Sequence, residues 1–325
     1  MKTPATPLVA LVGPTASGKS ALGVWLAERL GGEIVACDST QVYRYFSIGT
    51  AKPAPEEQRG IPHHLMDLLE PHELFTAGEY RRRALETLED LRRRRRLPIF
   101  TVGTGLYLRA LLEGLADAPT RSEELRARLS ERARRRGPEY LHRLLQRLDP
   151  QAAGRIAPRD LAKLIRAIEV CLLAGRPITE LHRAGRLRLE GYASLKVGLM
   201  PRRAELYRRI ERRVQTMLQR GWLDELQALL ARGISPAARP FQFIGYRELR
   251  AHLAGELSLP EAVAAIEQNT RRYAKRQLTW FRKEPGVAWF EGFGDDPAIA
   301  AAVLRHLEEL LAPASVSRAR TEGGV

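Results

Sequence analysis

The segment whose residue types and spacing carry the clearest chemical meaning is Gly13-Pro14-Thr15-Ala16-Ser17-Gly18-Lys19-Ser20. It fits the pattern G-x-x-x-x-G-K-[ST], in which glycines let successive backbone amides turn inward around a phosphate group. Lys19 would add a mobile cation, and the hydroxyl of Ser20 suits a Mg²⁺ ion. The segment therefore predicts a site for a phosphate-bearing ligand, with Mg²⁺ as the cofactor that Ser20 would hold.

Two further polar residues stand where apolar runs end. Asp38 follows the run 33–37, and Thr104 follows the run 97–102 after one glycine. Ligands of open α/β sheets lie at the carboxyl ends of the strands, so we expect both side chains to converge on the phosphate loop. Bound phosphates would repel a carboxylate there unless it served a metal ion or a proton, which makes Asp38 a candidate catalytic base.

The elements that must position these residues alternate along the first third of the chain. A short apolar run precedes the phosphate loop and a segment with helical periodicity follows it, as such a loop requires. The expected strands cover residues 8–12, 33–37, 97–102 and, later, 196–199, while the expected helices include 20–30 and 76–96. This alternation predicts the α/β class, with a P-loop NTPase-like core in which helices flank a parallel β-sheet.

Basic residues are concentrated in the middle of the chain. The 325 residues carry 53 Lys and Arg against 38 Asp and Glu, and the net charge of +15 favours a polyanionic partner such as nucleic acid. Residues 117–196 alone hold 18 basic and 10 acidic residues, in helical patterns. We therefore expect an inserted basic all-α domain at 117–196, a discontinuous core at 1–116 and 197–312, and a disordered tail at 313–325.

The composition also bears on the compartment. No apolar run approaches the length of a membrane span, the N-terminal residues do not resemble a secretory signal, and the two cysteines form no metal-binding or disulfide pattern. These features favour a cytoplasmic protein without a membrane partner, and we expect it to act as a monomer.

Seven motifs occur in an order that resembles one known family. They are residues 13–20, 38–43, 48–53, 63–65, 103–107, 244–248 and 276–282. Together they are similar to the bacterial tRNA isopentenyltransferases, or tRNA dimethylallyltransferases, over roughly residues 8–290. The resemblance implies transfer of a dimethylallyl group from dimethylallyl diphosphate to the exocyclic N6 amine of the adenine immediately 3′ of the tRNA anticodon.

The resemblance also implies roles for individual residues. Asp38 would act as the general base, Thr104 would assist the leaving diphosphate, and the loop 13–20 would hold that diphosphate together with Arg203. The anticodon stem-loop of the tRNA would contact both the core and the insertion. The implied contacts are Asp38, Ser39, Thr40, Gln41, Arg126, Ala162, Lys163, Leu164, Ile165, Arg166, Gln242, Phe243, Ile244, Gly245, Tyr246, Arg247, Thr270, Arg271, Arg272, Lys275 and Arg276.

Three other functions share parts of the pattern. A P-loop kinase of small molecules would use the same core but would not need the basic insertion. An adenylate isopentenyltransferase that acts on free AMP would likewise not need a surface of tRNA size. A non-catalytic RNA-binding protein with a P-loop switch would leave Asp38 and Thr104 without a role.

Overall fold

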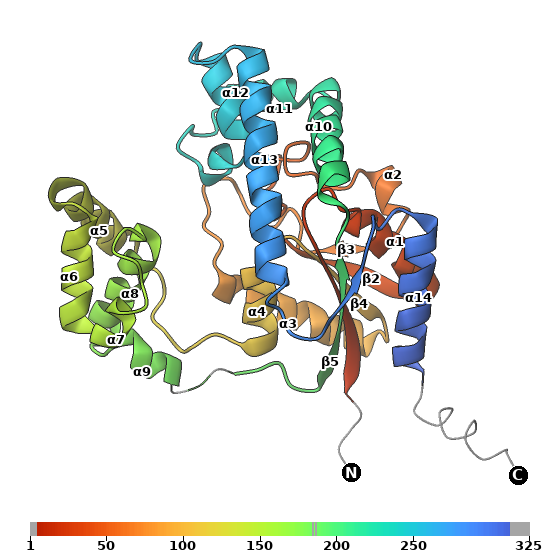
Figure 1. Ribbon diagram of the computed structural model, residues 1–325, viewed down its shortest axis with the longest axis horizontal. Helices are drawn as coiled ribbons and strands as arrows, with labels where there is room; N and C mark the ends of the chain where they lie inside the picture. Colours follow the sequence, from red (N-terminus) through yellow and green to blue (C-terminus); the bar gives the residue numbers. More distant parts are fainter. Residues whose placement is uncertain (1–4, 184, 186, 313–325) are drawn as a thin grey trace, which may run out of the picture. The chain divides into compact units, whose positions relative to one another are not determined.

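The computed structural model describes residues 5–183, 185 and 187–312, which form two compact units (Figure 1). The first unit combines the chain up to Leu111 with the chain from Glu190 onward, and the second is Leu112–Leu189. The sequence placed the insertion at 117–196, but strand β5, Tyr192–Leu199, belongs to the sheet of the first unit. The insertion therefore ends before this strand. The tail expected at 313–325 lies outside the described residues.

Among the described residues, six parallel strands form the sheet of the first unit in the order β3-β2-β4-β1-β5-β6. The other strands are β1 Thr6–Val12, β2 Gly32–Cys37, β3 His63–His64, β4 Leu97–Val102 and β6 Val287–Phe290. The predicted α/β class with a parallel sheet is confirmed.

The register of the sheet brings the ends of three central strands to one level. Leu11 on β1 pairs with Thr101 on β4, and Cys37 at the end of β2 pairs with Val102 at the end of β4. The segments that follow β1, β2 and β4 therefore leave the sheet at the same edge, next to one another. These are the segments that carry the predicted phosphate loop and the predicted base.

Helices cover both faces of the sheet (Figure 1). Those of the first unit are α1 Lys19–Leu30, α2 Pro55–Gln58, α3 Ala77–Arg93, α4 Gly105–Glu113, α10 Arg203–Gln219, α11 Trp222–Ala231, α12 Tyr246–Leu253, α13 Leu259–Phe281 and α14 Pro297–Leu311, with a 3₁₀ helix at Arg239–Gln242. Leu26 of α1 and Val303 of α14 join Val9 of β1 in one buried apolar cluster. The stripe from Tyr80 to Leu91 on α3 is buried against the other face.

Three short elements were not predicted. The sequence indicated only helices after residue 199, but Val287–Phe290 form β6, which extends the sheet beside β5. β3 has two residues and α2 has four. Elements of these lengths are too short for periodicity to identify them.

The second unit consists, in its described residues, of helices alone. They are α5 Glu123–Arg136, α6 Pro138–Leu148, α7 Pro150–Ala153, α8 Leu161–Ala174 and α9 Ile178–Arg183. Leu129, Leu141, Leu164 and Ile168 meet in a buried core that belongs to this unit. None of the described helices in either unit is both long and apolar enough to cross a lipid bilayer.

Candidate active site

The phosphate loop presents donor atoms that an anion needs. Gly18 adopts the left-handed conformation, with φ of 88°, and α1 begins at the next residue. The hydroxyl of Ser17 is buried, lines a large cavity and has no hydrogen-bond partner among the described residues. Backbone amides at a helix start and an unpartnered hydroxyl are both suited to phosphate oxygens.

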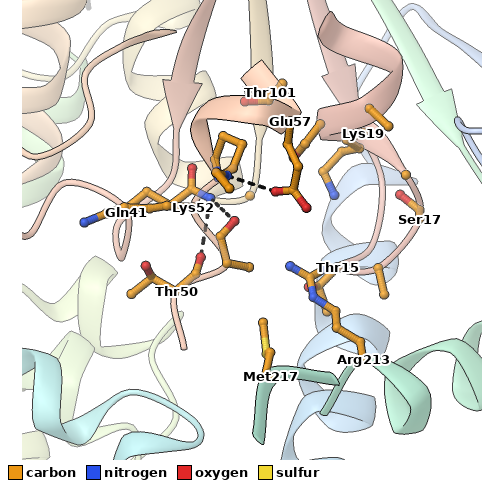
Figure 2. Close-up of a pocket in the computed structure, with 18 of the residues that line it drawn as sticks. Thr15, Ser17, Lys19, Gln41, Thr50, Lys52, Glu57, Thr101, Arg213 and Met217 are labelled. Carbon is orange, nitrogen blue, oxygen red and sulfur yellow. Dashed lines mark hydrogen bonds between the residues drawn. The ribbon is translucent and has the colours of Figure 1, made fainter. Parts of the chain in front are cut away.

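Lys19 of α1 and Arg213 of α10 direct their charged ends into the same cavity (Figure 2). Lys19 Nζ donates to the carbonyl oxygens of Gly13 and Pro14 at 3.0 and 2.7 Å. The pKa of Lys19 is lowered to about 7: burial is the main cause, the charge of Arg213 also lowers the pKa, and the charge of Asp38 partly opposes both. Burial also lowers the pKa of the Arg213 guanidinium. In such a poorly hydrated place each cation attracts an anionic ligand more strongly than it would at the surface.

The large cavity has a volume of about 1480 Å³, and all of its lining residues belong to the first unit. Small-molecule sites typically measure roughly 300–1,000 Å³. The cavity is therefore large enough for a diphosphate ligand and part of a second reactant. Its basic lining residues are Lys19, Lys52, Arg59, Arg208, Arg209, Arg212, Arg213 and Arg220.

The two carboxylate oxygens of Asp38 have different surroundings: one accepts hydrogen bonds, and the other lies against Gly103. Oδ1 accepts hydrogen bonds from the backbone N–H and the hydroxyl of Thr40, at 2.8 and 2.7 Å. Oδ2 lies so close to Gly103 that a β-carbon there would come within 1.9 Å of it. Thr40 thus fixes the carboxylate, and no described residue donates a hydrogen bond to Oδ2. Because Asp38 also lines the cavity, Oδ2 can accept a proton from a ligand.

Thr104 lies beside Asp38 but directs its hydroxyl to Ser39. Thr104 Oγ1 accepts from the backbone N–H of Ser39 at 3.0 Å and donates to Ser39 Oγ at 3.2 Å. Gly103 lines the large cavity, whereas Thr104 does not. In this structure Thr104 therefore holds the turn that carries Asp38.

One side chain of α13 joins the phosphate loop to the loop after β4. Gln277 Oε1 accepts from the backbone N–H of Thr15 at 2.7 Å, and its Nε2 donates to the carbonyl of Gly103 at 2.9 Å. Tyr273, one turn earlier, donates its hydroxyl to the same carbonyl at 3.1 Å. Since Gln277 is buried, it sets the separation of the two loops.

The arginine expected to hold the diphosphate does not reach the cavity. Arg203 is exposed at the start of α10 and donates to the hydroxyl of Tyr207 at 3.0 Å. Arg213, further along the same helix, lies in the cavity wall together with Arg209. The cavity is therefore lined by Arg213 and not by Arg203 in this structure, and the diphosphate contact expected of Arg203 stays a prediction. Several arginines of α10 stand at helical spacing, and the sequence alone did not show which of them faces the site.

A family model described as IPP transferase matches residues 41–284, most of the chain. The chain belongs to the IPP transferase family. The tRNA dimethylallyltransferase of Koribacter versatilis is 55% identical to it over 298 residues, which cover 92% of this chain and 97% of that protein. The tRNA dimethylallyltransferase of Solibacter usitatus is 50% identical over 305 residues, covering 94% and 99%.

Two solved structures extend the comparison. The tRNA isopentenylpyrophosphate transferase of Bacillus halodurans has a TM-score of 0.69 and 38% identity, covering 93% of this chain and 96% of its own. A eukaryotic dimethylallyltransferase acting on tRNA has a TM-score of 0.81 and 26% identity, covering 94% and 79%.

In this IPP transferase the implied tRNA contacts of the first unit differ in accessibility. Gly245 and Tyr246 are buried in this structure, which presents little surface of either residue to an RNA. Arg271 is held by Glu211, at 2.8 Å. The exposed residues are Gln242, Arg247, Arg272, Lys275 and Arg276, and the half-buried ones are Ser39, Thr40, Gln41, Phe243, Ile244 and Thr270.

A smaller cavity with a basic lining lies along α13. Its volume is about 720 Å³, and its lining residues are Arg109, Arg272, Lys275, Arg276, Thr279, Trp280 and Lys283. The Arg109 guanidinium lies 4.6 Å from the centroid of the Trp280 ring. Basic side chains without an acidic one among them suit the backbone phosphates of a nucleic acid.

In the second unit, two of the implied contacts share one buried carboxylate. Glu169 of α8 lies 3.3 Å from Arg126 and 2.7 Å from Arg166. Lys163 is exposed and pairs with Asp160 at 2.6 Å. Of the remaining contacts implied in α8, Leu164 is buried in the core of the unit, Ile165 is half-buried and Ala162 is exposed.

The protein groups available to a metal ion are oxygen donors. Ser20, in the first turn of α1, lines the large cavity together with Asp38 and Asp295. No group of three or more His, Cys, Asp or Glu side chains suited to a metal occurs among the described residues. Mg²⁺ commonly combines one or two protein oxygens with ligand phosphates and water, so these residues fit a Mg²⁺ ion bound together with a diphosphate.

Sequence reasoning missed three residues of this site. Gln277 lies in the motif 276–282 and Arg213 follows Arg203 by ten residues, but their roles depend on which helix face meets the cavity. Of these residues, Gln277 could have been found from the sequence, because a polar side chain at a core-facing position of a helix needs hydrogen-bond partners. Asp295 follows the unpredicted strand β6 and forms an ion pair with Arg209 at 2.6 Å beside the phosphate loop.

Proposed function

We propose that this chain transfers the dimethylallyl group of dimethylallyl diphosphate to the N6 amine of the adenine immediately 3′ of the anticodon in tRNAs. Family membership supports tRNA prenylation, since the relatives are tRNA dimethylallyltransferases and one structural neighbour acts on tRNA. The observation that carries the proposal is that one cavity is lined both by a phosphate loop with half-buried cations and by Asp38, whose Oδ2 accepts no hydrogen bond from the described residues.

In the proposed reaction the N6 lone pair attacks C1 of the dimethylallyl group. The bond from C1 to oxygen breaks, and its electron pair leaves with the diphosphate. The N6 proton passes to Asp38 Oδ2, which compensates for the weak nucleophilicity of an amine conjugated with the adenine ring. Lys19, Arg213 and the loop amides stabilise the charge that grows on the departing oxygen.

Thr104 has an indirect role in this proposal. Its hydroxyl holds Ser39 and thereby the turn that presents Asp38. Direct donation to the leaving oxygen, as the family resemblance implied, would require the hydroxyl to give up its hydrogen bond to Ser39 Oγ, while it could still accept from the Ser39 amide. Ser20 would hold Mg²⁺, which neutralises charge on the diphosphate when it is bound.

The target adenine must leave the anticodon loop to enter the large cavity. The exposed basic residues of α13 and of the second unit would bind the surrounding tRNA backbone, which positions the RNA without reading its sequence. The monomeric state expected from the sequence stays a prediction.

The proposal is tested by incubating the protein with labelled dimethylallyl diphosphate, Mg²⁺ and either tRNA, AMP or no acceptor. We expect label only in tRNA, at the adenine 3′ of the anticodon. Labelled AMP would favour an adenylate isopentenyltransferase, and no transfer at all would refute the proposal. Transfer of the γ-phosphoryl group of ATP to a small acceptor, with release of ADP, in a parallel incubation would favour a P-loop kinase.

A further inference from the structure

One wall of the large cavity is a non-helical loop, residues 47–52. Ser47, Ile48, Thr50 and Lys52 of this loop all line the cavity. In Figure 2, Thr50 and Lys52 lie across the cavity from the phosphate-loop residues Ser17 and Lys19. The loop therefore faces the site expected to hold the diphosphate, on the side where the rest of the donor and the acceptor must lie.

Two side chains from outside the cavity bind the backbone of this loop. Glu225 Oε2 on α11 accepts from the amides of Ser47 and Ile48 at 2.9 and 2.8 Å. The hydroxyl of Tyr246, the first residue of α12, accepts from the amide of Gly49 at 3.1 Å and donates to Glu225 Oε1 at 2.5 Å. Three consecutive amides of the loop thus donate hydrogen bonds to one carboxylate and one hydroxyl, which are themselves joined by a hydrogen bond.

The contact at Gly49 leaves no space for a side chain. A β-carbon at this position would lie 2.2 Å from Trp222 Nε1 and 2.5 Å from the ring of Tyr246. The ring of Tyr246 also packs edge-on against Phe46, with centroids 5.0 Å apart. Apolar packing from both sides therefore holds the middle of the loop, while the Glu225–Tyr246 pair fixes its amides.

We infer that Glu225 and Tyr246 are positioning residues for the transfer reaction, which hold loop 47–52 at the distance from the phosphate loop that the two reactants need. The inference rests on the proposed function. Tyr246 is fully buried, so its effect on the substrate passes through the loop and not through contact with tRNA. A displacement of about 1 Å in such a wall can cost a catalysed step about a hundredfold.

The test compares Tyr246→Phe, Glu225→Gln and Glu225→Ala with the wild type and with Asp224→Asn, an exposed neighbour on α11. Tyr246→Phe keeps the buried ring and removes only the hydroxyl, so the variant should fold. Glu225→Gln keeps an oxygen that can accept from Ser47 and Ile48, whereas Glu225→Ala does not. Three quantities are measured: the single-turnover rate at saturating substrates, the affinity for inorganic pyrophosphate, and amide hydrogen exchange in residues 44–52.

We expect Tyr246→Phe and Glu225→Ala to slow the single turnover by about 10- to 100-fold and to speed exchange at residues 47–49. Glu225→Gln should recover part of both losses, and Asp224→Asn should match the wild type. The pyrophosphate affinity should stay within about twofold, since the phosphate loop is held by other residues. A generally misfolded protein would lose this affinity as well.

Two results would overturn the inference without touching the proposed function. One is an unchanged transfer rate in both Tyr246→Phe and Glu225→Ala. The other is a parallel loss of transfer and of pyrophosphate binding, which would mean that the pair supports the whole cavity and not the loop alone. A wild-type protein that transfers nothing to tRNA would refute the proposed function, and the inference with it.

Discussion

The carboxylate of Asp38 rests on Gly103, at a distance that excludes any side chain at position 103. This contact joins the end of β2 to the end of β4, whose last residues, Cys37 and Val102, are paired in the sheet. It leaves Oδ2 of Asp38 beside the cavity while Oδ1 stays bonded to Thr40. The placement of the Asp38 carboxylate therefore depends on the absence of a side chain at Gly103 as well as on strand β2.

The first prediction concerns this contact. Gly103→Ala would place a β-carbon 1.9 Å from Oδ2, so Asp38 would have to rotate or the loop to move. We expect the single-turnover rate of prenyl transfer to fall by about a hundredfold or more, because displacement of a reacting group is costly. The matched control is Gly154→Ala, where the nearest atom would lie 3.6 Å away and φ is −66°. Equal rates for the two variants would contradict the geometry.

The second prediction concerns the base itself. Asp38→Asn keeps the size of the side chain and one oxygen for Thr40 but removes the proton acceptor. The single-turnover rate should fall by about 10²–10⁴-fold, the usual contribution of general-base catalysis, while tRNA binding changes little. A quenched-flow measurement at saturating tRNA, beside a filter-binding titration, checks both parts. An undiminished rate would remove Asp38 from the chemistry.

The sequence predicted those parts of the site that depend on local order. The phosphate loop, the four longer strands and the placement of Asp38 at a strand end follow from apolar runs bounded by glycine or aspartate. The parallel arrangement then dictates that strand ends meet. These arguments need no knowledge of tertiary contacts.

The remaining parts depend on contacts between residues far apart in sequence. Whether Arg203 or Arg213 faces the cavity depends on how α10 is rotated against its neighbours. The roles of Gln277 and Glu225 arise from hydrogen bonds to the backbone of distant loops, to which no local pattern points. Tyr246 belongs to a motif that the sequence linked to tRNA, and its complete burial becomes visible only in the folded structure.

The third prediction separates the two arginines of α10. Arg213→Gln should raise the KM for dimethylallyl diphosphate by roughly tenfold to a hundredfold, since a hydrogen bond to a charged group contributes about 1.5–3 kcal/mol. Arg203→Gln should leave it within about twofold, because Arg203 is exposed and bonded to Tyr207. Steady-state kinetics with saturating tRNA measures both constants. The reverse ranking would restore the expectation from sequence.

The fourth prediction uses the pKa of Lys19, which burial lowers to about 7. A bound pyrophosphate adds negative charge beside the ammonium and raises this pKa. Below pH 7 the group is already protonated, so its charge does not change on binding. Above pH 7 binding takes up a proton, and the affinity falls as the pH rises towards the pKa of the complex.

Calorimetry of pyrophosphate binding at about pH 8, in two buffers of different ionisation enthalpy, measures this uptake. Lys19→Arg serves as the reference, because its guanidinium stays charged and the titration of the ligand itself cancels in the comparison. We expect the wild type to take up close to one proton more than Lys19→Arg. Equal uptake would show that Lys19 does not change its protonation state when pyrophosphate binds.

The fifth prediction concerns electrostatic binding of tRNA by the second unit. Arg166 is a poor first target, because its removal would leave the buried Glu169 with one partner fewer. Lys163 is exposed, so Lys163→Gln should leave the fold intact. If Lys163 contacts a phosphate, the log–log salt slope of tRNA binding should decrease by somewhat less than one unit.

The control for this experiment is Arg93→Gln, at the exposed end of α3. Arg94 is unsuitable, since it forms an ion pair with the buried Glu33 at 2.5 Å. The Arg93 variant should keep the wild-type salt slope, and both variants should keep the KM for dimethylallyl diphosphate. A slope that changes for Arg93→Gln and not for Lys163→Gln would place the tRNA on a different face.

The double hydrogen bond of Gln277 has a thermodynamic consequence. The same side chain accepts from Thr15 and donates to Gly103, so a movement of α13 moves the phosphate loop and the loop after β4 together. The outer face of α13 carries exposed basic residues, including Arg272 and Lys275. An RNA that shifts this helix on docking therefore changes the affinity for the diphosphate. Because binding energies are reciprocal, the diphosphate then changes the affinity for the RNA by the same factor.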